Sequence, residues 1–143
     1  MNAPTATRPR RVSLTLLPRE AVRWNRDRSS FDRTLVYDVD SETQPGVTYT
    51  VVFTYRDGSY VCDCLAGQHG TRCKHVHSVI WWTTYERTRR DLAAMSDAEL
   101  RAYDRDLALA RAGLVTPWLH MEIDADACGD EIAARAEQRN TAA

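Results

Sequence analysis

The feature that most constrains the fold is a cluster of cysteines and histidines between residues 62 and 77. Three of the four cysteines and three of the four histidines of the 143-residue chain lie there, within the segment YVCDCLAGQHGTRCKHVHSV. Three thiolates and one imidazole are the donor set of a four-coordinate structural zinc site, and soft thiolate ligands favour zinc over magnesium or calcium. The cluster therefore predicts one structural Zn²⁺, bound by Cys62, Cys64, Cys73 and one nearby histidine, for which His75 is a candidate.

The spacing of these residues is compatible with one ion. Side chains at positions i and i+2 of a strand point to the same face, so Cys62 and Cys64 can both reach a metal from one arm of a hairpin. Two glycines in the eight-residue loop Leu65–Arg72 allow the chain to turn back. In a regular helix, positions i and i+2 point to nearly opposite sides. The pair Cys73 and His75 is therefore expected where the first turn of a helix is not yet regular.

Other interpretations of the cluster remain open at this point. His77 is four residues from Cys73 and shares its helical face, so it is a serious alternative ligand, and His69 in the loop is a weaker one. A disulfide needs an oxidising compartment, which nothing in the sequence indicates. A cysteine–histidine nucleophilic site is also conceivable, but no Asp or Asn is evident to orient the histidine. Cys128 lies far from the cluster and is expected to be a free thiol.

Strand patterns dominate the first half of the chain. Alternating apolar residues and runs of β-branched and aromatic side chains predict strands over Leu35–Val39, Val47–Tyr55 and Ser59–Cys64, with a weaker strand over Val12–Leu17. Asp57-Gly58 predicts a two-residue hairpin turn between the last two strands. Pro18 suits the first position of a helix, so a short helix is expected over residues 18–25.

Helical patterns dominate the second half. Apolar residues at three- and four-residue spacing predict a helix directly after the cluster. The capping box Ser96-Asp97-Ala98-Glu99 predicts the start of a second helix, and Gly113 its end. Pro117-Trp118-Leu119 is expected to form a loop, and the acidic, Ala-rich stretch from Glu122 a frayed last helix. The expected fold class is α+β: a small antiparallel sheet or hairpin and a helix hold one zinc ion, with an additional C-terminal helix.

Composition divides the chain into five segments. They are a disordered basic arm (1–11), an N-terminal strand and helix segment (12–46), a zinc-binding module (47–94), an amphipathic helix with a loop (95–121) and an acidic, Ala-rich tail (122–143). Residues 1–33 carry a net charge of +5 and the remainder −6, which gives −1 overall. A basic arm of this kind binds polyanions or folds back on the acidic body. No apolar run approaches the ~20 residues of a membrane span, so we expect a cytoplasmic protein without membrane contact.

The pattern Cys-x-Cys, a variable loop and Cys-x-His at a helix start resembles the SWIM-type zinc finger. The strands before Cys62, Lys74 between the last two ligands and the apolar helix after His75 add to the resemblance, which covers about residues 47–82. The resemblance implies that His75, not His77, is the fourth ligand. SWIM-type fingers occur in Mutator-like transposases, some chromatin-remodelling ATPases and recombination-associated proteins, and are thought to bind DNA or proteins.

The resemblance thus implies a nucleic-acid-binding accessory protein, most simply one that binds DNA. Candidate contacts are the basic residues Arg72, Lys74, Arg87, Arg89 and Arg90, and the candidate rings for base stacking are Tyr60, Trp81, Trp82 and Tyr85. Arginines on a helix surface are, however, more often solvated or paired with acids, and tryptophans beside a metal site are more often core residues. The alternative is a zinc-stabilised protein-interaction adaptor.

Catalysis is not expected from this sequence. A catalytic zinc ion keeps an open coordination position, whereas the four predicted ligands fill all positions of this one. The sequence also lacks a phosphate-binding loop and an evident pair of catalytic carboxylates. We therefore predict neither an enzyme nor a small-molecule substrate.

Overall fold

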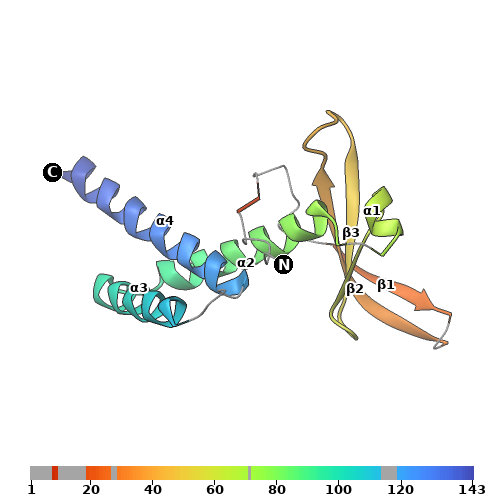
Figure 1. The fold of residues 1–143 in the computed structure, drawn as a ribbon, viewed down its shortest axis with the longest axis horizontal. Helices are drawn as coiled ribbons and strands as arrows, with labels where there is room; N and C mark the ends of the chain where they lie inside the picture. Colours follow the sequence, from red (N-terminus) through yellow and green to blue (C-terminus); the bar gives the residue numbers. More distant parts are fainter. Residues whose placement is uncertain (1–7, 10–18, 27–28, 71, 114–118) are drawn as a thin grey trace. The chain divides into compact units, whose positions relative to one another are not determined.

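The computed structural model describes residues 8–9, 19–26, 29–70, 72–113 and 119–143 (Figure 1). Within these residues the chain forms four antiparallel strands and four helices, which confirms the predicted α+β class. The chain divides into two compact units. The sheet unit is Pro9–Trp82, and the helical unit is Thr83–Ala143 together with Met1–Arg8.

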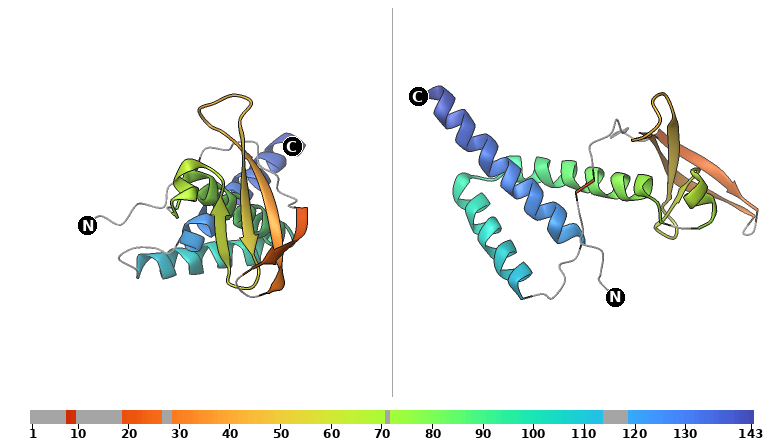
Figure 2. Two further views of the ribbon diagram at one scale, coloured as in Figure 1. Left: turned by 90° about the vertical axis from the view of Figure 1, so that its right-hand side faces the viewer. Right: turned by 45° about the horizontal axis from the view of Figure 1, so that its top comes forward.

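The sheet has the strand order β1-β2-β3-β4, so every neighbour in sequence is a neighbour in space. The strands are β1 (Arg19–Asn25), β2 (Ser30–Asp40), β3 (Thr48–Thr54) and β4 (Ser59–Cys62). The expected strands over residues 35–39 and 47–55 are confirmed, although β2 is longer than its alternating core predicts. The β1–β2 hairpin extends away from the start of helix α2, as two views show (Figures 1 and 2).

Three local predictions need correction. The helix expected over residues 18–25 is wrong from Arg19 onward, because this segment pairs with β2 at seven register positions. That ladder satisfies its backbone groups, whereas a lone helix of this length is marginal in water. The hairpin loop contains the four residues Tyr55–Gly58, not two, since Thr54 pairs with Ser59. Strand β4, expected over residues 59–64, ends at Cys62, two residues earlier than expected.

The core of the sheet unit lies on one face of the sheet. Alternation along β2 and β3 places Tyr37, Val39 and Val51 on that face, and the first turns of α2 (Lys74–Ala93) cover them with Val76 and Val79. Val39, Val51 and Val79 have no exposed surface. Burial of one such side chain contributes roughly 1.5–3 kcal/mol. The cysteines of the cluster belong to the same core, so the candidate site is built into it.

The helical unit contains the second half of α2, α3 (Asp97–Ala112) and α4 (Leu119–Ala142). Ser96 and Glu99 form the predicted capping box, and Gly113 caps the end of α3. The last helix is longer than the frayed segment expected from Glu122, because Ile123, Ala127 and Cys128 are buried along it. Leu119, expected in a loop, begins this helix.

Arg135 of α4 connects all three helices of this unit. Its guanidinium group donates hydrogen bonds to the backbone oxygens of Leu92 and Met95, each over 3.0 Å. It also contacts the carboxylates of Asp97 and Glu131 at 2.8 and 2.9 Å. The last carbonyls of a helix have no partner within the helix. Arg135 therefore caps the C-terminus of α2 from a distant part of the chain.

Several predictions fall on residues outside the described part of the chain. They include most of the expected disordered arm (1–11), the weak strand over residues 12–17, and Pro117 and Trp118 of the expected loop. Among the described helices, none has a stretch that is both long and apolar enough to cross a membrane.

Candidate metal centre

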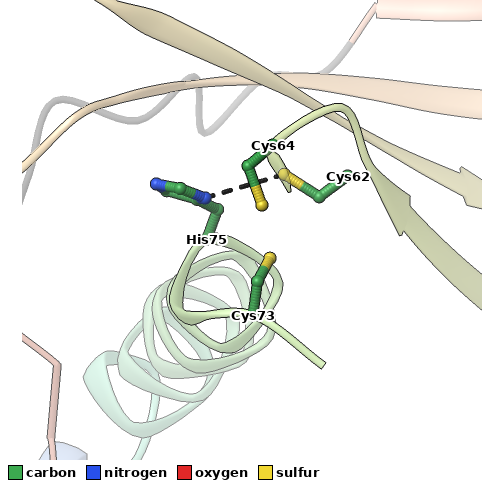
Figure 3. A group of neighbouring side chains, drawn as sticks. All are labelled: Cys62, Cys64, Cys73 and His75. Atoms are coloured by element: carbon green, nitrogen blue, oxygen red, sulfur yellow. Dashed lines mark hydrogen bonds between the residues drawn. The ribbon is translucent and has the colours of Figure 1, made fainter. Parts of the chain in front are cut away.

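Four residues from three neighbouring elements form the candidate centre (Figure 3). Cys62 ends β4, and Cys64 is the N-cap of the short helix α1 (Leu65–Gln68). Cys73 directly precedes α2, and His75 lies in its first turn. All four side chains are buried, and their ligand atoms lie within 4.8 Å of one another. Cys73 thus lies outside the regular helix, as the Cys-x-His spacing requires.

The distance between one sulfur and the nitrogen donor matches that of a four-coordinate ion. The Nδ1 atom of His75 lies 3.7 Å from the Sγ atom of Cys62. A tetrahedral ion with metal–sulfur bonds of about 2.3 Å and metal–nitrogen bonds of about 2.1 Å holds these two donors about 3.6 Å apart. Figure 3 shows the three sulfur atoms and this nitrogen turned toward one common point. The four residues can therefore hold one metal ion.

Backbone N–H groups already face two of the sulfur atoms. Gly67 donates to the Sγ of Cys64 over 3.3 Å, and Val76 donates to the Sγ of Cys73 over 3.5 Å. Both donors belong to first turns of helices, where N–H groups lack partners within the helix. Such bonds stabilise negative charge on sulfur, so the site is prepared for thiolates.

The thiols influence one another strongly because they are close and buried. Burial raises the pKa of Cys62 to about 12. Burial also opposes ionisation of Cys64, but the N–H of Gly67 and the neighbouring thiols outweigh it, so the pKa of Cys64 is lowered. Protein groups alone therefore accommodate one negative charge here more easily than several. A bound cation compensates the repulsion between several thiolates, and a thiol that coordinates a metal is deprotonated.

His75 is suited to bind a metal as a neutral imidazole. Burial, and then the charge of Lys74, lower the pKa of His75. Its ring lies against that of Tyr49, with centroids 4.2 Å apart. Its Nε2 atom is buried and has no hydrogen-bond partner among the described residues. This orientation leaves Nδ1 as the atom that faces the cysteines (Figure 3).

The two alternative histidines lie elsewhere. Among the described residues, the group of converging donors contains neither His77 nor His69. The ring of His77 lies near Trp81, with centroids 5.8 Å apart. His69 follows α1 as its C-cap residue and is exposed. The structure therefore brings His75 to the cysteines, in agreement with the resemblance.

Gly67, one of the two glycines expected to let the loop after Cys64 turn back, has a more specific structural role. A Cβ atom at this position would collide with the backbone oxygen of Cys62 and lie 2.8 Å from its Cβ atom. Real side chains do not approach so closely, so only glycine allows α1 to lie against the end of β4. The signal in the sequence was the glycine itself, but the neighbour it approaches is visible only in the fold.

The structure also bears on the disulfide interpretation and on the prediction for Cys128. The four cysteines, all of them in the described part of the chain, are free thiols. Cys128 is fully buried in α4, as the prediction of an isolated free thiol implies. Burial, and then the nearby charge of Asp104, raise the pKa of Cys128 to about 11. It is therefore a protonated core residue at neutral pH.

The predicted nucleic-acid contacts are divided between the two units. Arg72 and Lys74 belong to the sheet unit, and the other three arginines belong to the helical unit. Lys74 lies 3.6 Å from Glu42, whereas exposed Arg72 has no ion pair among the described residues. Arg89 forms a half-buried ion pair with Glu131 at 3.0 Å, so its contact is structural. Arg87 and Arg90 are exposed.

The predicted stacking rings are mostly unsuitable. Trp81, Trp82 and Tyr85 are buried, so the hypothesis that they stack on bases is wrong. They are apolar residues on several faces of one helix. Because all three are buried, a ligand cannot reach their rings. Tyr60 is half-buried and remains accessible.

Comparison with protein-family models, with curated proteins and with solved structures finds no match. The class of this protein therefore rests on its own fold and site. It is an α+β chain whose sheet and helix share a buried Cys₃His centre compatible with a structural metal ion.

Proposed function

We propose that this chain binds one Zn²⁺ ion through Cys62, Cys64, Cys73 and His75, and that the ion is structural. The observation that carries the proposal is the convergence of four buried ligand atoms within 4.8 Å. A set of three thiolates and one imidazole favours zinc over harder divalent cations. Four protein ligands leave no open position for water or substrate, so the proposed role excludes catalysis at the metal.

In this role the ion links β4, α1 and the start of α2. These elements supply all four ligands, and the three cysteines belong to the same buried cluster as Val76 and Val79 of α2. Structural zinc sites contribute their binding free energy to folding. The ion is therefore proposed to stabilise the sheet unit as a whole, in the manner of a SWIM-type finger.

We further propose that the zinc module makes the protein a nucleic-acid-binding accessory, with DNA as the partner. The support is the motif resemblance together with Arg72, an exposed cation without an ion pair among the described residues. Arg72 directly precedes the proposed ligand Cys73, so it would be positioned by the metal-bound turn. A protein partner is the alternative, and the binding experiment below distinguishes the two.

The metal proposal is tested by measuring the zinc content of the purified full chain and of two cysteine variants. We expect one zinc per chain in the wild type, loss of zinc in Cys73→Ser, and full retention in the control Cys128→Ser. Cobalt substitution should give the visible absorption of a tetrahedral thiolate site. Equal zinc content in both variants would contradict the proposed ligand set.

The partner proposal is tested by fluorescence anisotropy with labelled DNA at ~50 and ~200 mM salt. Phosphate contacts release counterions, so affinity should fall steeply with salt. Arg72→Gln should weaken binding, and Cys73→Ser should abolish it. Absence of any DNA binding at low salt would overturn the DNA role, and capture of a protein partner would then be the next experiment.

A further inference from the structure

The core face of the sheet continues beyond the core as an exposed surface. Val22, Phe31 and Tyr55 lie on this face with exposed fractions of 64, 65 and 48%. Phe31 has the same parity along β2 as buried Tyr37, so both side chains project to the same side. Isolated exposed apolar residues are common, but a contiguous group marks an interaction site.

Strand pairing and ring contacts connect Val22 with Tyr55, and Phe31 lies two positions from Arg33 on the same face of β2. Val22 of β1 is paired with Arg33 of β2. The guanidinium carbon of Arg33 lies 5.3 Å from the centre of the Tyr55 ring. That ring is 5.3 Å from Phe53, whose ring is 4.8 Å from Tyr60. We call this surface the stacking face and define it as Val22, Phe31, Arg33, Phe53, Tyr55 and Tyr60.

The stacking face combines aromatic rings with one accessible cation. The side chain of Arg33 is 70% exposed, and its ion pair with Glu20 spans 3.5 Å, with Glu20 69% exposed. Ion pairs this exposed are weak, so a phosphate can replace Glu20 as the partner of Arg33. An apolar protein surface docked here would instead bury both charges, which is unfavourable.

From these observations we propose that the stacking face binds single-stranded nucleic acid. Bases stack on Tyr55 and Phe31, and Arg33 contacts a phosphate. Single strands are favoured because their bases are free to stack on protein rings, whereas duplex bases already stack on each other. The inference rests on the proposed nucleic-acid role, but it assigns the contact to residues of the sheet other than the basic residues predicted from sequence.

The first test measures the affinity of the full, zinc-loaded chain for a labelled 12-nucleotide oligo(dT) by anisotropy. Stacking on one ring is worth about 5- to 150-fold in affinity, so Tyr55→Ala and Phe31→Ala should each weaken binding at least about fivefold. The matched control is Val61→Ala, because Val61 is 57% exposed but pairs with Val52 on the opposite face. Zinc content of each variant verifies that the fold is intact.

The second test uses the competition between Glu20 and a phosphate for Arg33. Glu20→Gln should tighten binding, whereas Arg33→Gln should weaken it and lower the salt slope by about one. A gain of affinity cannot arise from loss of folding, so Glu20→Gln keeps the proposal testable even if another variant is unstable.

The outcomes separate this inference from the proposed function. Binding of oligo(dT) that is unchanged in both aromatic variants would overturn the stacking face while leaving a DNA role in place. Tighter binding to a duplex of the same length than to oligo(dT) would also overturn it. If the wild type bound neither form of DNA, both proposals would fall.

Discussion

The Nδ1 atom of His75 lies 3.7 Å from the Sγ atom of Cys62, although thirteen positions separate the two residues in the chain. One belongs to the first turn of α2 and the other to the last position of β4. Their approach closes the turn that contains α1 and completes the group of four donors. The metal proposal and the stability of the sheet unit therefore depend on the same contact.

Removal of the metal should unfold the sheet unit. Chelation leaves buried thiols that compete for charge, and the apparent binding energy of structural zinc, ~10–16 kcal/mol, is lost from folding. A loss of even about 3 kcal/mol lowers the midpoint of thermal unfolding by roughly 10 °C in a chain of this size. Circular dichroism with and without chelator measures the change. The Cys73→Ser variant is the control, and a chelator effect of equal size in it would contradict the prediction.

Gly67→Ala should disrupt the candidate centre. The new Cβ atom collides with the backbone of Cys62, and overpacking of this kind costs about 1–3 kcal/mol. The variant should also bind metal more weakly, which competition with a chelating dye measures. The same substitution at Gly129 is the matched control, since no atom lies within 4 Å of its added Cβ. Gly129→Ala in helix α4 should stabilise the protein by about 1 kcal/mol. Equal stability of both variants would contradict this assignment.

Arg135→Met should destabilise the helical unit. The substitution keeps much of the side-chain volume but removes the guanidinium donor of the Met95 oxygen and of the Leu92 oxygen, which keeps the N–H of Met95 as a donor. We expect a lower midpoint of thermal unfolding and faster hydrogen exchange at the end of α2. Arg105→Met is the control, because Arg105 is exposed and, within the described part of the chain, its one ion pair is with Asp106 at 4.0 Å. A similar midpoint in both variants would show that the capping contacts are unimportant.

The carboxyl group of Asp130 should titrate below its ordinary range. The hydroxyl group of Tyr85 donates to it, and Arg8 donates a second hydrogen bond over 3.0 Å. These contacts outweigh burial and lower the pKa of Asp130. A pKa that is lower in the folded state stabilises the fold above the unfolded value of about 3.9, and this contribution is lost as pH falls through the folded value.

The substitution Tyr85→Phe removes the hydrogen bond that lowers the pKa of Asp130 the most. The pKa of Asp130, followed by NMR of its side-chain carboxyl carbon, should therefore rise in the variant. Because this pKa is higher in the variant, the loss of folding stability at acid pH should begin at a higher pH than in the wild type. An unchanged titration of Asp130 would contradict the assigned hydrogen bond.

Much of the local structure could be predicted from short stretches of sequence. Residue type and spacing were sufficient to nominate Cys62, Cys64, Cys73 and one histidine as donors, because ligand chemistry depends on residue type, and the motif resemblance selected His75. The capping box at Ser96 and the alternating pattern of β3 were equally local signals. Each depends on hydrogen bonds or side-chain periodicity within a few residues, and so can be recognised without the rest of the chain.

Other features required the folded chain because they depend on partners distant in sequence. β1 is a strand only since β2 supplies its backbone partners, and the buried tryptophans are excluded from binding only by packing. The choice of His75 over His77 rests on which imidazole the first turn of α2 directs toward β4. The exposure of Phe31 and Tyr55 follows from where the core ends on the sheet. Composition and spacing thus specified the chemistry, while long-range pairing and burial decided which residues can carry it out.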